Sequence, residues 1–257
     1  MSQPAPLAQL GLLVAVVVVL GYLRCVRRNR VGPWPRRRTA SWVLGWAIAY
    51  VSALALLPGH PMRPRVHMLG HLGLAMLAPV LLVVAAPLTL VLRSLPVPRA
   101  RRLVTWLHRA PVRWLVHPVV AAVLDVGGLW LLYTTPLLAW AHASALLSVV
   151  VIMHLGTAGF LFTAAMISVD PLPRRPSYAR RAVVLVLAAA AHGILAKHLY
   201  AVASDPAGRR AAMIMYYGGD LVEVVLVIVL GLGWWRRTGH TVRPPAVTDW
   251  ADVPRRR

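Results

Sequence analysis

Seven long apolar runs, separated by polar or arginine-rich segments, constrain the fold of this chain more than any other feature. Each run approaches or exceeds the roughly 20 residues that a helix needs to cross the hydrocarbon core of a bilayer. The runs cover residues 7–23, 41–57, 67–92, 118–133, 142–169, 182–202 and 213–235. Backbone groups in lipid must be hydrogen-bonded within the protein, and the runs lack the alternation of a transmembrane barrel. We therefore expect an all-α, polytopic membrane protein with a bundle of about seven transmembrane helices.

The composition agrees with this class, because 59% of the 257 residues are hydrophobic and only 14% are charged. Residues 1–237 predict a single transmembrane helical domain. Residues 238–257 contain several prolines and end in three arginines, which predicts a disordered basic tail. The single cysteine, Cys25, has no disulfide partner within the chain. A bound metal would therefore have to be held by histidine, methionine or carboxylate side chains.

The net charge of +21 raises the possibility of nucleic-acid binding, but the arginines collect in alternate segments between the runs. Segments 24–40, 93–116, 170–181 and 236–257 hold 7, 6, 4 and 6 arginines, whereas segments 58–66, 134–141 and 203–212 hold 2, 0 and 2. Because arginine-rich loops remain in the cytoplasm, the pattern predicts the orientation of a multi-pass membrane protein. Its N-terminus would lie outside and its C-terminus in the cytoplasm. We expect the arginines to contact anionic membrane lipids, and no nucleic acid.

Ionisable residues lie inside the apolar runs, where they are energetically costly and often mark an ion, proton or metal site. A rise of about 1.5 Å per residue places them in two layers. The outer layer contains His67, His71, His142, Lys197, His198, Asp220 and Glu223, and the layer nearer the midplane contains Asp125, His154 and His192. Within the runs, no histidine or carboxylate is confined to the inner leaflet. This asymmetry predicts a site near the outer surface.

The motif HMLGH, which begins at His67 and ends at His71, is the strongest single signal. Residues four apart share one helical face, so two imidazoles at this spacing can bind one metal ion. Met68 lies beside them, and a thioether shifts the metal preference toward Cu(I). The alternative is that both histidines are polar residues at the membrane boundary with no metal role.

Asp220 and Glu223 are three residues apart and share a face of the last apolar run. Acids at this depth require partners, and Lys197 and His198 are the natural candidates. One possibility is an ion pair from Lys197 that fixes helix packing. The other is that one acid completes a metal site or orients a metal-binding histidine through its second nitrogen.

His154 and His192 lie near the midplane on different helices, and Asp125 could be the partner of either. Imidazoles in such positions hydrogen-bond across helix interfaces, relay protons, or bind a metal or haem. A single histidine in a helix more often forms a hydrogen bond across a helix interface than it relays protons or binds a metal or haem.

Four segments carry a resemblance to a known family. They are HMLGHLGLAMLAPVLLVVAAPLTLVLRSLP (67–96), HPVVAAVLDVGGLWLLYTTPLL (117–138), MHLGTAGFLFTAAMISVDPLPRRPSY (153–178) and YYGGDLVEVVL (216–226). In these segments and in their order, the chain resembles the CtaG-type cytochrome c oxidase assembly proteins. The resemblance implies a multi-pass protein of the bacterial plasma membrane that helps to form active haem–copper oxidase, at the stage of copper delivery to the catalytic subunit. It also matches His67, His71, His154, His192 and Asp220 to positions of the family.

Residues and resemblance together lead us to expect copper held transiently at the outer face by His67 and His71, with Met68, His198 or an acid as exchangeable ligands. The full set of candidate metal ligands is His67, His71, Met68, His154, His192, His198, Asp220 and Glu223. Weak, open coordination would favour transfer of the metal. The expected partners are the catalytic subunit of the oxidase or other copper chaperones.

Other classes of function remain open at this stage. A membrane redox protein could hold haem between His154 and His192. A copper or proton transporter would need a continuous polar path, and the inner leaflet lacks the groups for one. A metal-free scaffold for oxidase assembly would tolerate replacement of His67 and His71. An enzyme has the least support, because no nucleophile with an attendant base, phosphate-binding loop or complete hydrolase motif is present.

Overall fold

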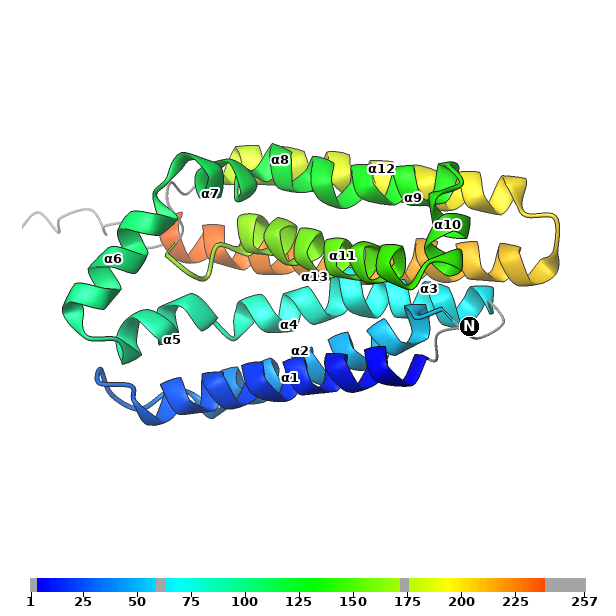
Figure 1. The fold of residues 1–257 in the computed structure, drawn as a ribbon. Helices are drawn as coiled ribbons and strands as arrows, with labels where there is room; N and C mark the ends of the chain where they lie inside the picture. The colour runs from blue at the N-terminus through cyan, green and yellow to red at the C-terminus, as the bar shows by residue number, and fades with distance from the viewer. Residues whose placement is uncertain (1–3, 59–62, 172–175, 239–257) are drawn as a thin grey trace, which may run out of the picture.

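The structure, a computed structural model, describes residues 4–58, 63–171 and 176–238, and these residues form helices and no strand. Figure 1 shows the long helices side by side along a common axis, with the amino terminus at one end of the bundle. The prediction of an all-α architecture is therefore confirmed. The predicted tail, residues 238–257, lies outside the described residues beyond Thr238.

Six helical spans within the described residues are long and apolar enough to cross a membrane. They are α1 (Pro4–Arg27), α2 (Arg36–Leu56), the composite span Pro64–Ser94, α11 (Ala145–Ile167), α12 (Tyr178–Val202) and α13 (Pro206–Thr238). A seventh crossing results if the pair Pro118–Thr134 and α10 (Leu137–Ala143), bent by 80°, counts as one span. The count agrees with the expected polytopic bundle.

The composite third span consists of α3 (Pro64–Leu72), the π-helix η1 (Gly73–Leu77), α4 (Ala78–Val84) and α5 (Pro87–Ser94). It breaks before Pro87, where Ala86 adopts a left-handed conformation with φ of 52°, and proline cannot supply the amide that a continuous helix needs. The carboxylate of Asp170 then accepts hydrogen bonds from the backbone N–H groups of Leu88 (3.1 Å) and Thr89 (2.8 Å). An aspartate from a distant loop therefore caps the start of α5.

The fourth span consists of α8 (Pro118–Ala122), the π-helix η2 (Val123–Gly127) and α9 (Gly128–Thr134), and α10 turns away after it. The prediction that the fifth helix begins at His142 is wrong, because His142 belongs to α10. Helix α11 begins after Ser144, whose side chain accepts a hydrogen bond from the backbone N–H of Leu147 at 3.3 Å. Serine in this role is a strong helix start, so the apolar run is divided into two helices.

Helix α11 approaches η1 so closely that only glycine fits at the contact. A Cβ atom built on Gly159 would overlap the backbone oxygen of Ala75. Small residues permit such approaches between membrane helices. This contact places η1 in the interior of the bundle, directly after the motif that carries the two spaced histidines.

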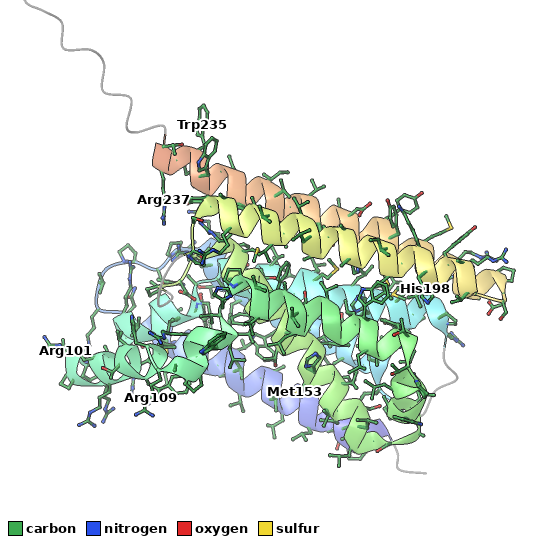
Figure 2. The ribbon with its side chains drawn as sticks, turned by 90° about the horizontal axis from the view of Figure 1, so that it is seen from above. Arg101, Arg109, Met153, His198, Trp235 and Arg237 are labelled. Carbon is green, nitrogen blue, oxygen red and sulfur yellow. The ribbon has the colours of Figure 1, made fainter. Side chains whose placement is uncertain are left out.

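The two ends of the bundle differ in character. Short helices α6 (Val97–Leu107) and α7 (Ala110–Leu115) lie at the end where α13 terminates, which we call the basic end. Figure 2 labels Arg101, Arg109 and Arg237 toward this end and His198 toward the other, which we call the histidine end.

Candidate functional site

Four imidazole rings and one phenol form a row near the histidine end. The ring centroids of His142 and His67 are 5.6 Å apart, and those of His71 and His192 are 6.2 Å apart. Tyr133 of α9 lies between the two pairs, with its ring centroid 6.0 Å from that of His67 and 6.0 Å from that of His71. Its hydroxyl is 3.1 Å from Nε2 of His67. We call these five side chains the imidazole row.

The rotation of α3 directs two members of the row into the bundle. His67 and His71 are four residues apart and share one face, and they are 8% and 0% exposed. On an adjacent face, Gly70 lies directly on α2, where a Cβ atom would come within 2.9 Å of the backbone oxygen of Ser52. This close contact with α2 restrains the rotation of α3, and the imidazoles therefore cannot turn toward lipid.

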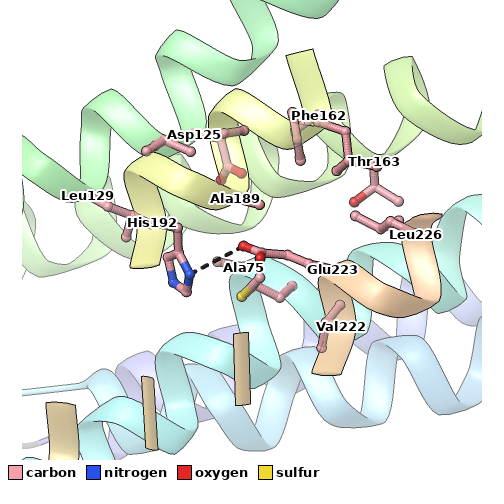
Figure 3. A pocket seen from close by; sticks show the side chains of 14 residues that line it. Ala75, Asp125, Leu129, Phe162, Thr163, Ala189, His192, Val222, Glu223 and Leu226 are labelled. Carbon is pink, nitrogen blue, oxygen red and sulfur yellow. Dashed lines mark ion pairs between the residues drawn. The ribbon is translucent and has the colours of Figure 1, made fainter. Parts of the chain in front are cut away.

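Glu223 of α13 extends the row at its inner end. Its Oε1 lies 3.3 Å from Nδ1 of His192, and Figure 3 draws this pair. The ring of His192 packs so closely against Gly219 that a Cβ atom there would overlap it. A carboxylate beside one imidazole nitrogen favours the proton on that nitrogen. The lone pair of the other nitrogen is then available to bind a metal ion. The expectation that an acid orients a histidine therefore has a geometric counterpart here.

The row contains buried nitrogens without hydrogen-bond partners among the described residues. They are Nδ1 of His67, both ring nitrogens of His71 and both of His192, of which Nδ1 has the ion-pair contact with Glu223. A buried polar atom without a partner destabilises a protein by about 1–3 kcal/mol, so such atoms are uncommon and call for a physical reason. A bound ion or water at these nitrogens would supply the missing partner.

The spacing of the rings is compatible with a shared metal ion. A metal–nitrogen bond of about 2 Å on each side places two imidazole centroids about 6 Å apart when both bind one ion in a near-linear arrangement. The distances of 5.6 Å and 6.2 Å lie close to this value. Among the described residues, however, no three His, Cys, Asp or Glu side chains are arranged to hold a metal ion as they stand. The geometry therefore fits weak sites of two nitrogens better than a closed site of three or four ligands.

A small cavity lies beyond the inner end of the row. It has a volume of about 20 Å³, and its lining includes His192, Glu223, Asp125 and Thr163. Figure 3 shows Glu223 directed toward His192, with Asp125 on the neighbouring π-helix η2. A cavity of this size has room for about one water molecule. The structure thus places Asp125 on the lining of the same cavity as His192, which is one of the two histidines that the sequence offered as its partner.

His154 lies apart from the row. Its Nε2 is 3.0 Å from the backbone oxygen of Leu124, and its ring packs so closely on Gly128 that a Cβ atom there would overlap it. Residues near a π-helix expose carbonyl groups that a regular helix would use internally. His154 therefore occupies a packing and hydrogen-bonding position.

His198, Lys197 and Asp220 also lie outside the row. The exposed ring of His198 stacks on Trp130 with centroids 6.3 Å apart, and the ammonium group of Lys197 lies 5.2 Å from the ring centroid of Tyr216. An ion pair from Lys197 to an acid of α13, one of the two possibilities that the sequence left open, is not present among the described residues, and Glu223 pairs with His192 instead. Asp220 is half-buried.

Met68 is buried at 5% exposure in an apolar cluster that also contains Leu74 and Met215. Tyr133 of the imidazole row packs against this cluster. The side chains of Met68 and Met215 therefore belong to the apolar cluster that Tyr133 contacts.

Sequence reasoning overlooked Tyr133 and left His142 out of the ligand set. Tyr133 ends the fourth apolar run, directly before the TTP segment that bends the chain toward α10. The signal that could have identified Tyr133 and His142 is a tyrosine at the end of a span, followed by a proline-containing turn. Such a turn can bring a later histidine back toward the tyrosine.

Comparisons with known proteins place the chain among oxidase assembly proteins. The family model described as "Cytochrome c oxidase caa3 assembly factor (Caa3_CtaG)" matches residues 19–237. Uncharacterized proteins of Mycobacterium bovis and Mycobacterium tuberculosis are each 36% identical over 187 residues, which cover 65% of this chain and 27% of theirs. An uncharacterized protein of Mycobacterium leprae is 30% identical over 261 residues, covering 89% of this chain and 39% of the relative. The chain thus spans well under half of the length of these relatives, and no solved structure matches it.

Proposed function

Because the chain belongs to the family of cytochrome c oxidase caa3 assembly factors, we propose that it assists oxidase assembly by holding copper transiently in the imidazole row. Membership of the family supports the role in oxidase assembly, and the imidazole row supports copper as the metal that is held. The observation that carries the proposal is the set of buried imidazole nitrogens without hydrogen-bond partners among the described residues. Imidazole is a suitable ligand for copper, and thioether sulfur, present in Met68 and Met215 of the cluster that Tyr133 contacts, favours Cu(I).

Each residue of the row has a distinct role in this proposal. His142 and His67 form the first pair of nitrogens that a copper ion meets from the histidine end, because His142 is half-buried whereas His71 is fully buried. His71 and His192 form the second, deeper pair. Glu223 holds Nδ1 of His192 and supplies a negative charge near the cation.

Sites of two nitrogens suit delivery better than storage. A copper ion with few ligands keeps positions open for a ligand from the acceptor, so transfer can proceed by exchange of one bond at a time. The acceptor in this proposal is the catalytic subunit of the oxidase or another copper chaperone. The arginine distribution supports a histidine end that lies on the outer side of the plasma membrane.

Anaerobic titration of the purified full-length chain with Cu(I), in competition with a chromogenic chelator, tests the proposal. The variant His67→Ala/His71→Ala removes one nitrogen from each pair. His108→Ala is the matched control, because His108 is exposed at the basic end and its Nδ1 contacts the backbone oxygen of Val104 in the preceding helix α6. We expect near-stoichiometric copper on the parent and the control, and its loss in the double variant.

A parent chain that is folded, as judged by circular dichroism, yet binds no copper would contradict the proposal. The family role would then be that of a metal-free scaffold. If the double variant retained as much copper as the parent, the copper site would lie outside the imidazole row.

A further inference from the structure

Helix α6 at the basic end has an apolar side that the bundle does not cover. None of its residues is buried, and Val97 and Val104, which are seven residues apart and share this side, are 64% and 39% exposed. The same helix carries Arg99, Arg101 and Arg102. Short helices with an apolar side and a basic side lie in the interface of a membrane, with the apolar side against acyl chains.

An open groove of about 670 Å³ separates α6 from the rest of the basic end. One wall is α6, the second is the end of α5, and the third is the segment that follows α1. Its apolar lining includes Leu92, Val97 and Val104. Its lining also contains three arginines, Arg30, Arg93 and Arg101. The groove therefore combines a hydrocarbon-like surface with three positive charges.

The arginines of the groove have no carboxylate beside them. The groove lining contains no acidic residue. Among the described residues, the acid–base ion pair is the one between His192 and Glu223, deeper in the bundle. The positive charge of the groove is therefore available to an anion from outside the chain.

Contacts within the fold hold two of the walls in place. The backbone N–H of Arg30 donates to the backbone oxygen of Arg93 at 3.4 Å, which joins the first loop to α5. The guanidinium of Arg93 lies 5.6 Å from the ring centroid of Trp34. Asp170 fixes the start of α5 through the hydrogen bonds described above. Arg30 and Arg93 are thus neighbours in a pre-formed wall rather than independent surface side chains.

The groove lies at the depth where lipid headgroups are expected. Arg93 is in the last turn of the span Pro64–Ser94, so the groove begins where this apolar crossing ends. Exposed tryptophans, among them Trp106, Trp114 and Trp235, are found on the elements of the same end. Tryptophan is enriched at the membrane–water interface.

We propose that this groove is a binding site for an anionic phospholipid. The phosphodiester contacts Arg30, Arg93 and Arg101, and an acyl chain lies along Leu92, Val97 and Val104. Arginine matches phosphate through several parallel hydrogen bonds, and basic pockets beside membrane helices bind anionic headgroups. The apolar wall selects a lipid over a free phosphate ion. Bound lipid would cover the exposed side of α6 and anchor the basic end, independently of any copper site.

Native mass spectrometry of the full chain, released from detergent with defined lipids, tests this site. Phosphatidylglycerol is compared with phosphatidylcholine, and inorganic phosphate serves as a competitor. The test variant is Arg93→Gln/Arg101→Gln. The control Arg109→Gln/Arg113→Gln removes the same charge from α7 and its N-terminal flank, outside the groove.

We expect the parent and the control to retain phosphatidylglycerol in preference to phosphatidylcholine, and the test variant to bind it about 30-fold more weakly. Arg93→Lys/Arg101→Lys, which keeps the charge, is expected to recover much of the binding. All substituted side chains are exposed, and unchanged thermal unfolding would verify the fold.

Three results would overturn the proposal. They are equal loss in the test and control variants, absence of a headgroup preference in the parent, and displacement of the lipid by an equal concentration of inorganic phosphate. The first would indicate diffuse charge attraction, and the last would indicate a simple anion site.

Discussion

At the scale of single residues, the most informative feature is an imidazole that is fully buried without a hydrogen-bond partner among the described residues. His71 is 0% exposed, and both of its ring nitrogens are in this state. A histidine with a purely structural role would be expected to donate and accept hydrogen bonds, as His67 does with Tyr133 through one nitrogen. In the proposed function, His71 uses its ring nitrogens to bind copper instead.

Replacement of His71 by leucine separates these two roles. An apolar side chain of similar size removes the unsatisfied nitrogens, so we expect the free energy of unfolding of the copper-free protein to change by no more than about 1 kcal/mol. The rise in thermal unfolding midpoint that Cu(I) causes in the parent should disappear. Thermal unfolding in detergent, with and without copper, measures both effects. A large destabilisation of the copper-free variant would instead reveal a structural hydrogen bond.

Glu223 allows a second prediction at this scale. Glu223→Gln keeps an oxygen near Nδ1 of His192 but removes the negative charge, so we expect copper affinity to fall by about 10–100-fold with the helical content unchanged. Asp220→Asn is the matched control, because Asp220 lies one turn away on the same helix and does not pair with the row. Chelator competition measures both affinities. Equal effects of the two substitutions would argue against a specific role of Glu223.

At the scale of elements, the site depends on how closely neighbouring helices approach. Helices α3 and α11 meet their neighbours through glycines whose missing side chains leave no space for a methyl group. Interiors packed to this density respond to small changes in volume. The two π-helices, η1 and η2, lie in the same part of the bundle, and η2 carries Asp125. Elements of this type are often found at functional sites.

Gly159→Ala and Gly156→Ala form a matched pair that tests this packing. A Cβ atom on Gly159 would overlap the backbone oxygen of Ala75, whereas one on Gly156 would lie 3.4 Å from a side-chain carbon of Leu74. We expect Gly159→Ala to destabilise the protein by about 1–3 kcal/mol and Gly156→Ala to have a much smaller effect. Thermal unfolding midpoints compare them. Similar midpoints for the two variants would mean that α11 can shift away from η1 without loss.

At the scale of the whole molecule, the two ends have opposite chemistry. The basic end carries most of the described arginines, α6 and the lipid groove, while the imidazole row begins near the histidine end. An arginine-rich end remains in the cytoplasm during membrane insertion. The proposed copper site and the proposed lipid site would therefore face opposite sides of the membrane.

Cysteine labelling in intact cells tests this orientation. In a Cys25→Ser background, Ser204→Cys places a thiol at the histidine end, and His108→Cys places one at the basic end; both positions are exposed. A membrane-impermeant maleimide should label the first thiol in intact cells, and the second only after the membrane is opened. The reverse labelling pattern would show that the histidine end lies in the cytoplasm, and it would contradict an outer location of the imidazole row.

The sequence alone determined the helical class, the number of crossings to within one, and the contrast between the two ends. Apolar transfer energies and loop charges are properties of local segments, so they can be summed without knowledge of the neighbours. The spacing of His67 and His71 also established that they share a face, because that follows from helix geometry.

Only the tertiary structure decided which polar groups meet. His192 and Glu223 join the row, whereas His154 turns to the backbone of Leu124, although depth along the helices placed His154 and His192 together. Depth is a one-dimensional quantity, while contact depends also on the rotation of each helix about its axis. That rotation is restrained by close contacts such as those of Gly70 on α2 and Gly159 on η1. Tyr133 entered the row for the same reason, since the bend before α10 depends on how α9 and α10 pack against their neighbours.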